Sequence, residues 1–262
     1  MISYNGQWYI LGQNSGAKSW SPLELSPSLW LDASDTSSIT AGPTGNVSEW
    51  RDISGNDFHV NQSTANVQPT SGTTTLNGLN VIDWGESTNP KYLGNDGDGT
   101  QNWQDIYIVS RYDGGSIFSD YHGLFTGFNV TPPAHNGIGL IADASSLRPQ
   151  NQWYTEAKWW DDNYLNGSQL SAPYTVLGVT PSIEQPFLTS ISTTTNLSSI
   201  DGVCIGNDRK NIAPNRGWRG IICEILAFNT KLSEENRKII EGYLAHKWGL
   251  INKLPNDHPF TP

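Results

Sequence analysis

The chain has 262 residues and a formal net charge of −10 at pH 7. This length fits one large all-β domain or two smaller domains. The acidic balance opposes binding to nucleic-acid phosphates and to anionic membranes, so no nucleic-acid partner is expected. No apolar run approaches the ~20 residues of a membrane-spanning helix, and the first five residues lack the basic and apolar regions of a signal peptide.

The first 27 residues are predicted to form a separate attachment segment. Residues 2–4 and 7–11 flank Asn5-Gly6, which is a strong signal for a two-residue hairpin turn, and residues 12–27 are typical of a linker. The aromatic side chains of this hairpin either pack on the main domain or dock on another chain. These attachment residues are Tyr4, Trp8 and Tyr9.

From residue 28 onward, the pattern predicts roughly a dozen short strands separated by turns. The composition agrees, because only 15% of the residues are charged while there are 26 Gly and 11 Trp. Residues 106–112 begin apolar on both faces, so this strand is expected to be central. The principal predicted strands span residues 47–51, 58–62, 81–84, 106–112, 124–128, 138–142, 187–192 and 200–206. No repeat of 20 to 50 residues is present, which excludes propellers and solenoids.

One acidic, glycine-rich stretch is a candidate calcium site. Residues 95–100 read Asn-Asp-Gly-Asp-Gly-Thr and would place alternate oxygen ligands on a flexible loop, as calcium requires. Asp96 and Asp98 are the candidate ligands, and Asp113 and Asp120 are further candidates. The stretch lacks the Glu that completes a twelve-residue EF-hand loop. The alternative is a solvated turn that binds no metal.

A tryptophan-rich stretch is the candidate carbohydrate site. Sugars bind to flat aromatic faces with carboxylates or amides nearby for the hydroxyl groups. Residues 153–164 supply both kinds of side chain within a short distance. The candidate ligand-binding residues are Trp153, Tyr154, Trp160, Asp161 and Asn163. The alternative is that these rings fill the interior of the domain.

The end of the chain predicts a long buried strand followed by a helix. On the strand, strict alternation places Ile222 and Leu226 on one face and Cys223 and Ile225 on the other, with both faces apolar. The helix is expected to be capped by a serine, to end at a glycine and to lie against an edge or rim of a β-sandwich. These capping residues are Ser233 and Gly249. Residues 251–262 are expected to form an extended tail pinned by Phe260.

Two cysteines and one glutamate in this region have open alternatives. Cys204 and Cys223 are interpreted as buried small hydrophobes, with a cross-strand disulfide as the alternative. Glu224 is interpreted as a buried carboxylate paired with an arginine such as Arg51 or Arg219, with a catalytic role as the alternative.

Segments at both ends of the chain carry a family resemblance. They are Leu29-Trp30-Leu31-Asp32-Ala33-Ser34-Asp35, Trp50-Arg51-Asp52-Ile53-Ser54-Gly55-Asn56-Asp57, Trp218-Arg219-Gly220, Glu224-Ile225-Leu226, Leu232-Ser233-Glu234 and Glu241-Gly242-Tyr243-Leu244-Ala245-His246-Lys247-Trp248-Gly249-Leu250. Together they resemble laminin G-like modules of the concanavalin A-like lectin/glucanase superfamily. The resemblance covers residues 28–250 and implies an all-β, jelly-roll β-sandwich, here with one C-terminal helix. It also marks residues 164–170 as a hairpin whose turn lies near a ligand rim.

The resemblance does not choose a function, because the superfamily includes lectins, adhesins, spacer domains and glycosidases. A glycosidase needs paired carboxylates, and the Glu-x-Asp-x-(x)-Glu run of the glucanase branch is not found here. The five histidines show no metal-ligand spacing. The chain is therefore expected not to be an enzyme, with glycoside hydrolase as the least favoured reading.

The favoured function is a non-catalytic surface or recognition module. We expect a bacteriophage virion protein, either a capsid decoration or a tail-fibre component, joined to other virion subunits or to copies of itself through residues 1–27. It would be displayed on the virion surface and would have a cell-surface glycan as a candidate ligand. The alternative is a bacterial carbohydrate-binding adhesin module, located outside the cell or on its surface.

Overall fold

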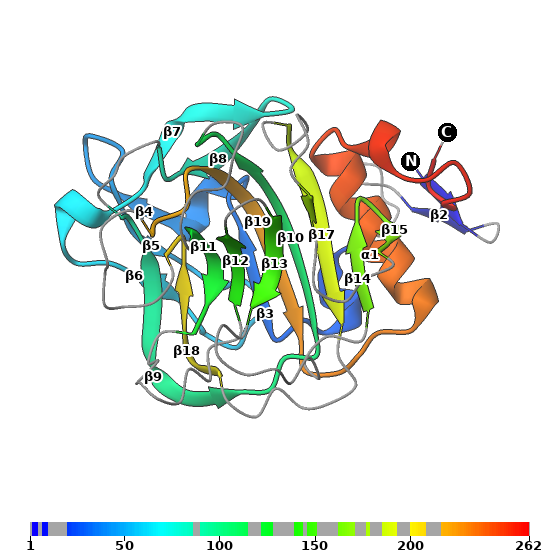
Figure 1. The fold of residues 1–262 in the computed structure, drawn as a ribbon, viewed down its shortest axis with the longest axis horizontal. Helices are drawn as coiled ribbons and strands as arrows, with labels where there is room; N and C mark the ends of the chain where they lie inside the picture. Colours follow the sequence, from blue (N-terminus) through cyan, green and yellow to red (C-terminus); the bar gives the residue numbers. More distant parts are fainter. Residues whose placement is uncertain are drawn as a thin grey trace.

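The computed structural model describes residues 2–4, 7–9, 20–85, 90–114, 122–127, 139–143, 146–150, 162–170, 177–178, 185–192, 200–207 and 216–261. Only the backbone is described at residues 2–4, 7–9, 97–100, 139–143, 146–150, 177–178 and 200–201. Two antiparallel sheets face each other, and a single α-helix of the described part, α1 (Glu234–Lys247), follows the last strand (Figure 1). The predicted all-β sandwich with one C-terminal helix is therefore confirmed.

The sheet next to the helix is called the helix-side sheet. Its strand order is β15-β14-β17-β10-β19-β8-β7, and β3 also pairs with β19. Its strands are β3 (Leu29–Asp32), β7 (Thr70–Leu76), β8 (Leu79–Asp83), β10 (Asp105–Tyr112), β14 (Asp162–Leu165), β15 (Ser168–Gln169), β17 (Phe187–Ser192) and β19 (Gly220–Phe228).

The second sheet is called the far sheet, and its order is β16-β13-β12-β11-β18-β9-β6-β5-β4. Its strands are β4 (Ile39–Ala41), β5 (Val47–Trp50), β6 (Val60–Asn61), β9 (Leu93–Gln101), β11 (His122–Thr126), β12 (Gly139–Asp143), β13 (Ser146–Gln150), β16 (Leu177–Gly178) and β18 (Ile200–Ile205). Short 3-10 helices lie at η1 (Pro22–Leu25), η2 (Thr36–Ser38), η3 (Ala65–Val67) and η4 (Ile251–Lys253).

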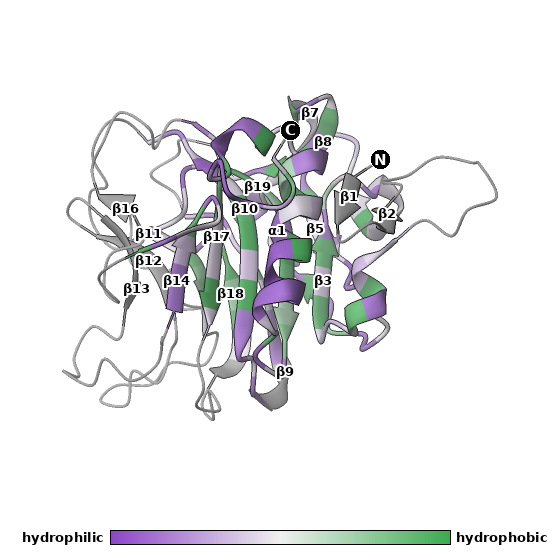
Figure 2. Cartoon of the chain, turned by 90° about the vertical axis from the view of Figure 1, so that its right-hand side faces the viewer, coloured by the Kyte–Doolittle hydropathy of each residue, from purple (hydrophilic) through white to green (hydrophobic). Residues whose placement is uncertain are grey.

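Two hydrophobic clusters divide the molecule into three layers. One cluster fills the space between the sheets, and the other lies between the helix-side sheet and α1. Figure 2 views the molecule from the helix side. The helix was expected at an edge or rim, and that expectation is wrong, because α1 covers the outer face of the helix-side sheet. The physical reason is β19, whose residues are buried on both faces and need a layer on each side.

A bulge in β19 changes which side chains share a face. The pairing partner of Val109 is Glu224 and that of Ser110 is Ile222, so Cys223 is the extra residue. Ile222 and Ile225 consequently both belong to the cluster between the sheets. Strict alternation, which placed them on opposite faces, is wrong across this point.

The ends of α1 match their sequence signals. The hydroxyl of Ser233 accepts a hydrogen bond from the backbone N–H of Asn236 at 3.2 Å, as an N-cap does. Gly249 has φ 73°, and the N–H of Leu250 donates to the carbonyl of Ala245 at 2.7 Å. This is the Schellman arrangement, and glycine adopts that φ with the least strain.

The N-terminal hairpin is confirmed in its backbone, with β1 (Ile2–Tyr4) pairing β2 (Gln7–Tyr9). The prediction that residues 20–27 are part of a linker is wrong. Trp20 is buried, with its ring 5.5 Å from that of Tyr243, and Pro22 is buried as well. Residues 20–27 therefore belong to the helix layer.

The C-terminal tail contains η4 and turns, so the expectation of an extended tail is wrong. Phe260 is 3% exposed, as expected for an anchor. Its ring lies against Gly242 of α1, where any Cβ would overlap it. The tail thus folds back onto the helix.

Cys204 and Cys223 are both buried and are not joined in a disulfide, which confirms their interpretation as small hydrophobes. In the described part of the chain, no helix combines the length and the apolar character needed to cross a membrane.

Candidate functional site

The segments of the family resemblance meet at Glu224, which is 0% exposed. Its carboxylate accepts hydrogen bonds from the indole N–H groups of Trp30 at 2.8 Å and Trp248 at 2.7 Å, and from the Tyr243 hydroxyl at 3.0 Å. Its ion-pair partner is Lys247 at 2.7 Å. The predicted arginine partner is therefore wrong. Glu224 is held by donors from β3, α1 and the residue that follows α1, which makes it a structural carboxylate.

The charge balance of this cluster explains its pKa shifts. The ammonium of Lys247 also lies 2.6 Å from Asp32, so one cation serves two carboxylates. Burial, together with the nearby charge of Asp32, raises the pKa of Glu224 more than Lys247 lowers it. Burial lowers the pKa of Lys247, but Glu224 and Asp32 together outweigh that effect and raise it.

A second buried carboxylate, Asp52, fastens the opening segment of the resemblance. It accepts hydrogen bonds from the backbone N–H of Trp30 at 2.9 Å and of Phe58 at 3.1 Å, and from the Ser54 hydroxyl at 2.8 Å. Glu224 and Asp52 therefore hold the same β3 residue from two sides. The resemblance residues build the scaffold, and the candidate site lies elsewhere.

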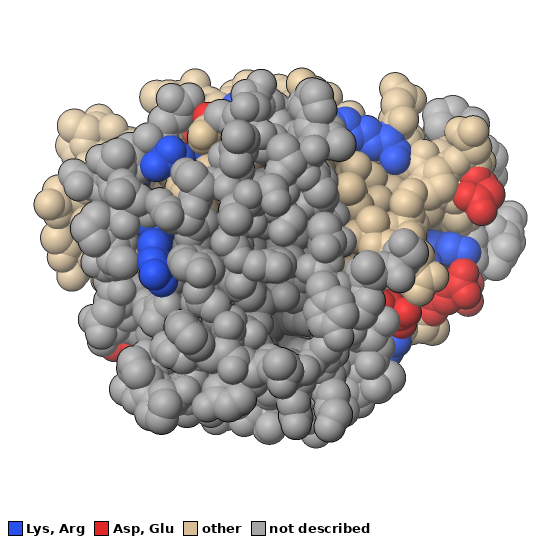
Figure 3. Space-filling view, in the orientation of Figure 1, with Lys and Arg blue, Asp and Glu red and all other residues tan. Residues whose placement is uncertain are grey.

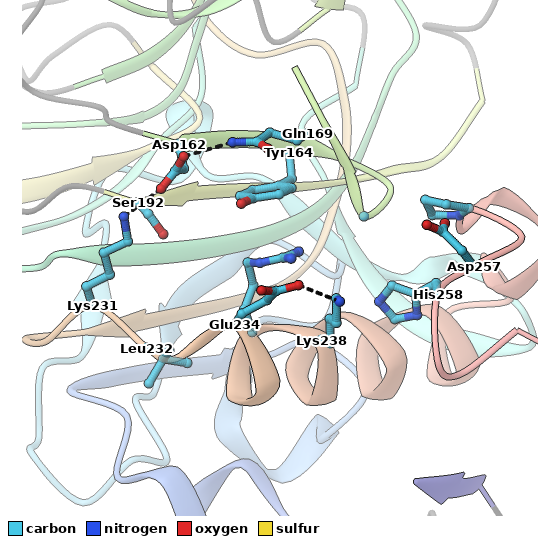
Figure 4. Close-up of a pocket in the computed structure, with 13 residues that line it drawn as sticks. Asp162, Tyr164, Gln169, Ser192, Lys231, Leu232, Glu234, Lys238, Asp257 and His258 are labelled. Carbon is cyan, nitrogen blue, oxygen red and sulfur yellow. Dashed lines mark hydrogen bonds and ion pairs between the residues drawn. The ribbon is translucent and has the colours of Figure 1, made fainter. Parts of the chain in front are cut away.

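The candidate site is a cleft of about 410 Å³ on the outer side of the helix-side sheet (Figure 4). Four parts of the chain form it: the β14–β15 hairpin, the end of β17, the start of α1 with the residues before it, and the C-terminal tail. Acidic and basic side chains lie side by side on the right of the molecule in Figure 3, over α1 and this hairpin. Its lining includes the side chains of Asp162, Tyr164, Gln169, Ser192, Lys231, Glu234, Arg237, Lys238, Asp257 and His258.

The hairpin turn at the cleft confirms its Asn-Gly sequence signal. Asn166 has φ 48° and Gly167 has φ 79°, the left-handed values that a two-residue turn requires. A Cβ at Gly167 would lie 3.2 Å from both Leu254 and Pro255. The turn therefore packs closely against the tail, and both border the cleft.

One wall of the cleft is organised by Asp162 of β14. Its carboxylate accepts hydrogen bonds from the Lys231 ammonium at 2.6 Å and from the Gln169 amide at 2.9 Å. All three side chains are exposed or half-buried, and the bonds can be followed in Figure 4. This wall offers both donors and acceptors to a ligand.

The opposite wall is organised by Arg237 of α1. Its guanidinium lies 2.6 Å from the buried Glu241 and 3.8 Å from the centre of the Tyr164 ring. Burial lowers the pKa of Arg237, yet the charge of Glu241 raises it overall. Glu241 also accepts from the Ser190 hydroxyl at 2.9 Å and contacts His258 of the tail at 3.4 Å. Glu241 thus positions Arg237, which in turn positions Tyr164.

Asp105 of β10 fixes the segment that enters α1. Its carboxylate accepts from the backbone N–H of Leu232 at 2.7 Å and from the hydroxyls of Ser192 at 2.5 Å and Tyr107 at 3.2 Å. Burial raises the pKa of Asp105 in spite of these donors. The floor of the cleft is therefore rigid and hydrogen-bonded.

The predicted carbohydrate residues are only partly covered by the structure. Trp153, Tyr154, Trp160 and Asp161 lie outside the described residues. Asn163 lies in β14 and is 2% exposed, whereas its neighbours Asp162 and Tyr164 line the cleft. The described end of the tryptophan-rich stretch therefore lines the cleft with Asp162 and Tyr164, and not with the predicted residue Asn163.

The candidate calcium stretch lies in β9 and not in a loop. Residues 95 and 100 pair with Val203 and Asp201 of β18, and the register shifts between them. Asp96 is exposed, and the Asp98 side chain and Asp120 lie outside the described part. Asp113 forms an ion pair with Arg111 at 2.6 Å. Among the residues whose side chains are described, no group of three acidic, histidine or cysteine residues could hold a metal ion.

The attachment residues Tyr4, Trp8 and Tyr9 are described only in their backbone. The residues that sequence reasoning missed are Lys231, Arg237, Glu241 and His258. One signal was available, because Arg237 and Glu241 are four positions apart on a helix face, where opposite charges pair. The approach of the tail, which contributes His258, had no local signal.

No protein-family model matches this chain, and no curated protein matches it in sequence.

Proposed function

We propose that this chain is a non-catalytic β-sandwich module that recognises a carbohydrate and is displayed on the surface of a virus particle. The observation that carries the proposal is the cleft. It brings an aromatic ring, Tyr164, together with an amide, a hydroxyl and ion-paired side chains at the end of the tryptophan-rich stretch. Aromatic and hydrogen-bonding groups in one concavity are what a sugar requires.

The laminin G-like, jelly-roll assignment is part of this proposal. Its support is that the opening and closing segments of the resemblance meet in space, where Trp30 and Trp248 both donate to Glu224. That the module is not an enzyme is also part of the proposal, and the positions of its carboxylates support it. Glu224 and Glu241 are each 0% exposed, so neither reaches a substrate as a general acid would. Of the acids that line the cleft, Asp162 and Glu234 are paired with lysines, which leaves Asp257 as the one unpaired carboxylate of the described lining, whereas a glycosidase needs two.

Binding to a glycan panel tests carbohydrate recognition. The full-length protein should retain at least one glycan, and Tyr164→Ala should weaken that binding by about tenfold or more, because a stacked ring is lost. Tyr92→Ala removes a half-buried tyrosine outside the cleft and should leave binding unchanged. Trp160→Ala, in the neighbouring stretch, tests whether that stretch shares the ligand. Retention of no glycan at all would refute the recognition function.

Attachment to a particle is proposed for the N-terminal hairpin. Its support is that β1 and β2 form a hairpin with three aromatic residues, separated in sequence from the buried Trp20. Deleting residues 1–19 retains Trp20 and should leave a folded protein that no longer joins particles or oligomers. Size-exclusion chromatography and particle incorporation measure this outcome. Unchanged assembly would show that the hairpin is not the anchor, and an adhesin outside a particle would then be favoured.

A further inference from the structure

The cations that line the cleft are already neutralised by neighbouring carboxylates. Lys231 lies 2.6 Å from Asp162, and Lys238 lies 2.6 Å from Glu234. Arg237 lies 2.6 Å from Glu241, which is buried and does not itself line the cleft. An anionic ligand would have to compete with one of these carboxylates for its cation.

One acidic side chain of the lining has no such partner. Asp257 is an exposed residue of the tail and forms no ion pair within the described part of the chain. The three ion pairs contain three acids and three cations, so Asp257 leaves the lining and Glu241 with four acids against three lysines and arginines. The local field therefore opposes a negatively charged ligand.

The remaining polar groups suit hydroxyls. Gln169 presents an amide and Tyr164 presents a hydroxyl, and both groups can donate and accept. Ser192 borders the same space, but its hydroxyl is buried and donates to Asp105. The cleft volume of about 410 Å³ lies toward the small end of the range for ligand pockets. The space fits a small polyol ligand better than a long chain lying fully within it.

We propose that the cleft binds an uncharged saccharide and discriminates against its acidic counterpart through Asp257. This inference rests on the proposed carbohydrate function and narrows it to one chemical class. Asp257 acts as a specificity-determining residue, because it repels an anion and leaves the hydrogen bonds to a neutral sugar in place.

Matched pairs of methyl glycosides test this selectivity. Each pair consists of a neutral hexoside and the corresponding hexuronide, such as a glucoside with its glucuronide or a galactoside with its galacturonide. Binding to the full-length protein is measured by ligand-observed NMR and calorimetry at low salt. For the pair that binds, the neutral member should bind about tenfold more tightly.

Two variants assign the selectivity to Asp257. Asp257→Asn should bring the affinity of the acidic member closer to that of the neutral member by several-fold. Glu235→Gln removes the same charge from an exposed position outside the lining, and it should leave the ratio unchanged. Because both positions are exposed, neither change is expected to unfold the protein.

The outcomes separate the two proposals. An acidic member that binds as tightly as its neutral partner, or more tightly, overturns the inference and leaves carbohydrate recognition standing. The inference is also overturned if Asp257→Asn leaves the ratio of the two affinities, neutral to acidic, unchanged. Failure of every glycoside and of every glycan on the panel overturns both proposals.

Discussion

Lys247 joins α1 to two carboxylates of the helix-side sheet. Its ammonium lies 2.7 Å from Glu224 and 2.6 Å from Asp32, and Glu224 is 0% exposed. Lys247→Met would leave a buried carboxylate without its cation. We expect a loss of about 3–5 kcal/mol in the free energy of unfolding, because an uncompensated buried charge is costly.

Chemical denaturation measures this loss, and Lys238→Met is the matched control on the same helix. Lys238 pairs with Glu234, which is 72% exposed, so its removal should change stability little. Equal losses in the two variants would show that the Glu224 cluster contributes no more than a surface pair.

Because Asp105 has a raised pKa in the folded protein, we expect the free energy of unfolding to depend on pH. Burial raises the native pKa of Asp105 above the ordinary value of 3.8, so the folded protein binds this proton more tightly than the unfolded chain. The contribution of this group is fully present below the ordinary pKa and is lost as the pH rises through the raised value. Asp105→Asn removes the titration, and the rotatable Ser192 hydroxyl can then accept a hydrogen bond from the amide.

The stability of the wild type relative to Asp105→Asn should consequently fall as the pH rises from about 4 and level off above the native pKa. Urea denaturation across this range measures it, with Glu235→Gln as a control. A difference that stays constant or rises with pH would contradict the assignment.

At the scale of elements, the tail and α1 form one unit through Gly242 and Phe260. Alanine normally stabilises a helix interior relative to glycine by ~1 kcal/mol. Here a Cβ would overlap the Phe260 ring, so Gly242→Ala should instead release the tail. Phe260→Ala should cost about 3 kcal/mol in the wild type and much less in the Gly242→Ala background.

Denaturation of the double-mutant cycle tests this coupling, and limited proteolysis reports release of the tail. Because the tail supplies Asp257 and His258, glycan binding should fall together with tail docking. Additive losses would show that the ring and the glycine do not meet.

An element could be predicted from the sequence where the residues that determine it are close together in the chain. The helix was predictable, because Ser233, Gly249 and the apolar stripe are all local. The faces of β19 were not, since the bulge at Cys223 is set by pairing with β10. Residues 95–100 resembled a loop, but pairing with β18 overrides the weak strand propensity of Asp and Gly.

The candidate site was less predictable than the fold. Asp162 and Tyr164 adjoin a stretch that the sequence singled out, whereas Lys231, Arg237 and His258 come from segments at least 60 positions further along the chain. Only tertiary packing brings them to the β14–β15 hairpin. The identity of Lys247 as the partner of Glu224 has the same origin, because two arginines elsewhere in the chain fit the sequence equally well.

At the scale of the whole molecule, the three layers predict an order of local stability. Every residue of β17 and β19 is buried, and both strands lie between neighbours in the helix-side sheet, whereas β4 and β7 are terminal strands with exposed residues. Backbone amides buried on both faces exchange with solvent only when the whole core opens. The amides of β17 and β19 should therefore exchange most slowly, and those of β4 and β7 much faster.

Native-state hydrogen exchange checks this order and connects it to Lys247. If β19 opens only by global unfolding, Lys247→Met should lower the exchange free energy of β19 by the same amount as it lowers the free energy of unfolding. Exchange in β4 and β7, which proceeds by local opening, should change less. A loss confined to α1 would mean that the helix layer opens on its own, and the sandwich would then be stable without it. Equal losses in α1 and β19 would mean that the three layers unfold as one unit, which is the outcome we expect from a strand that is apolar on both faces.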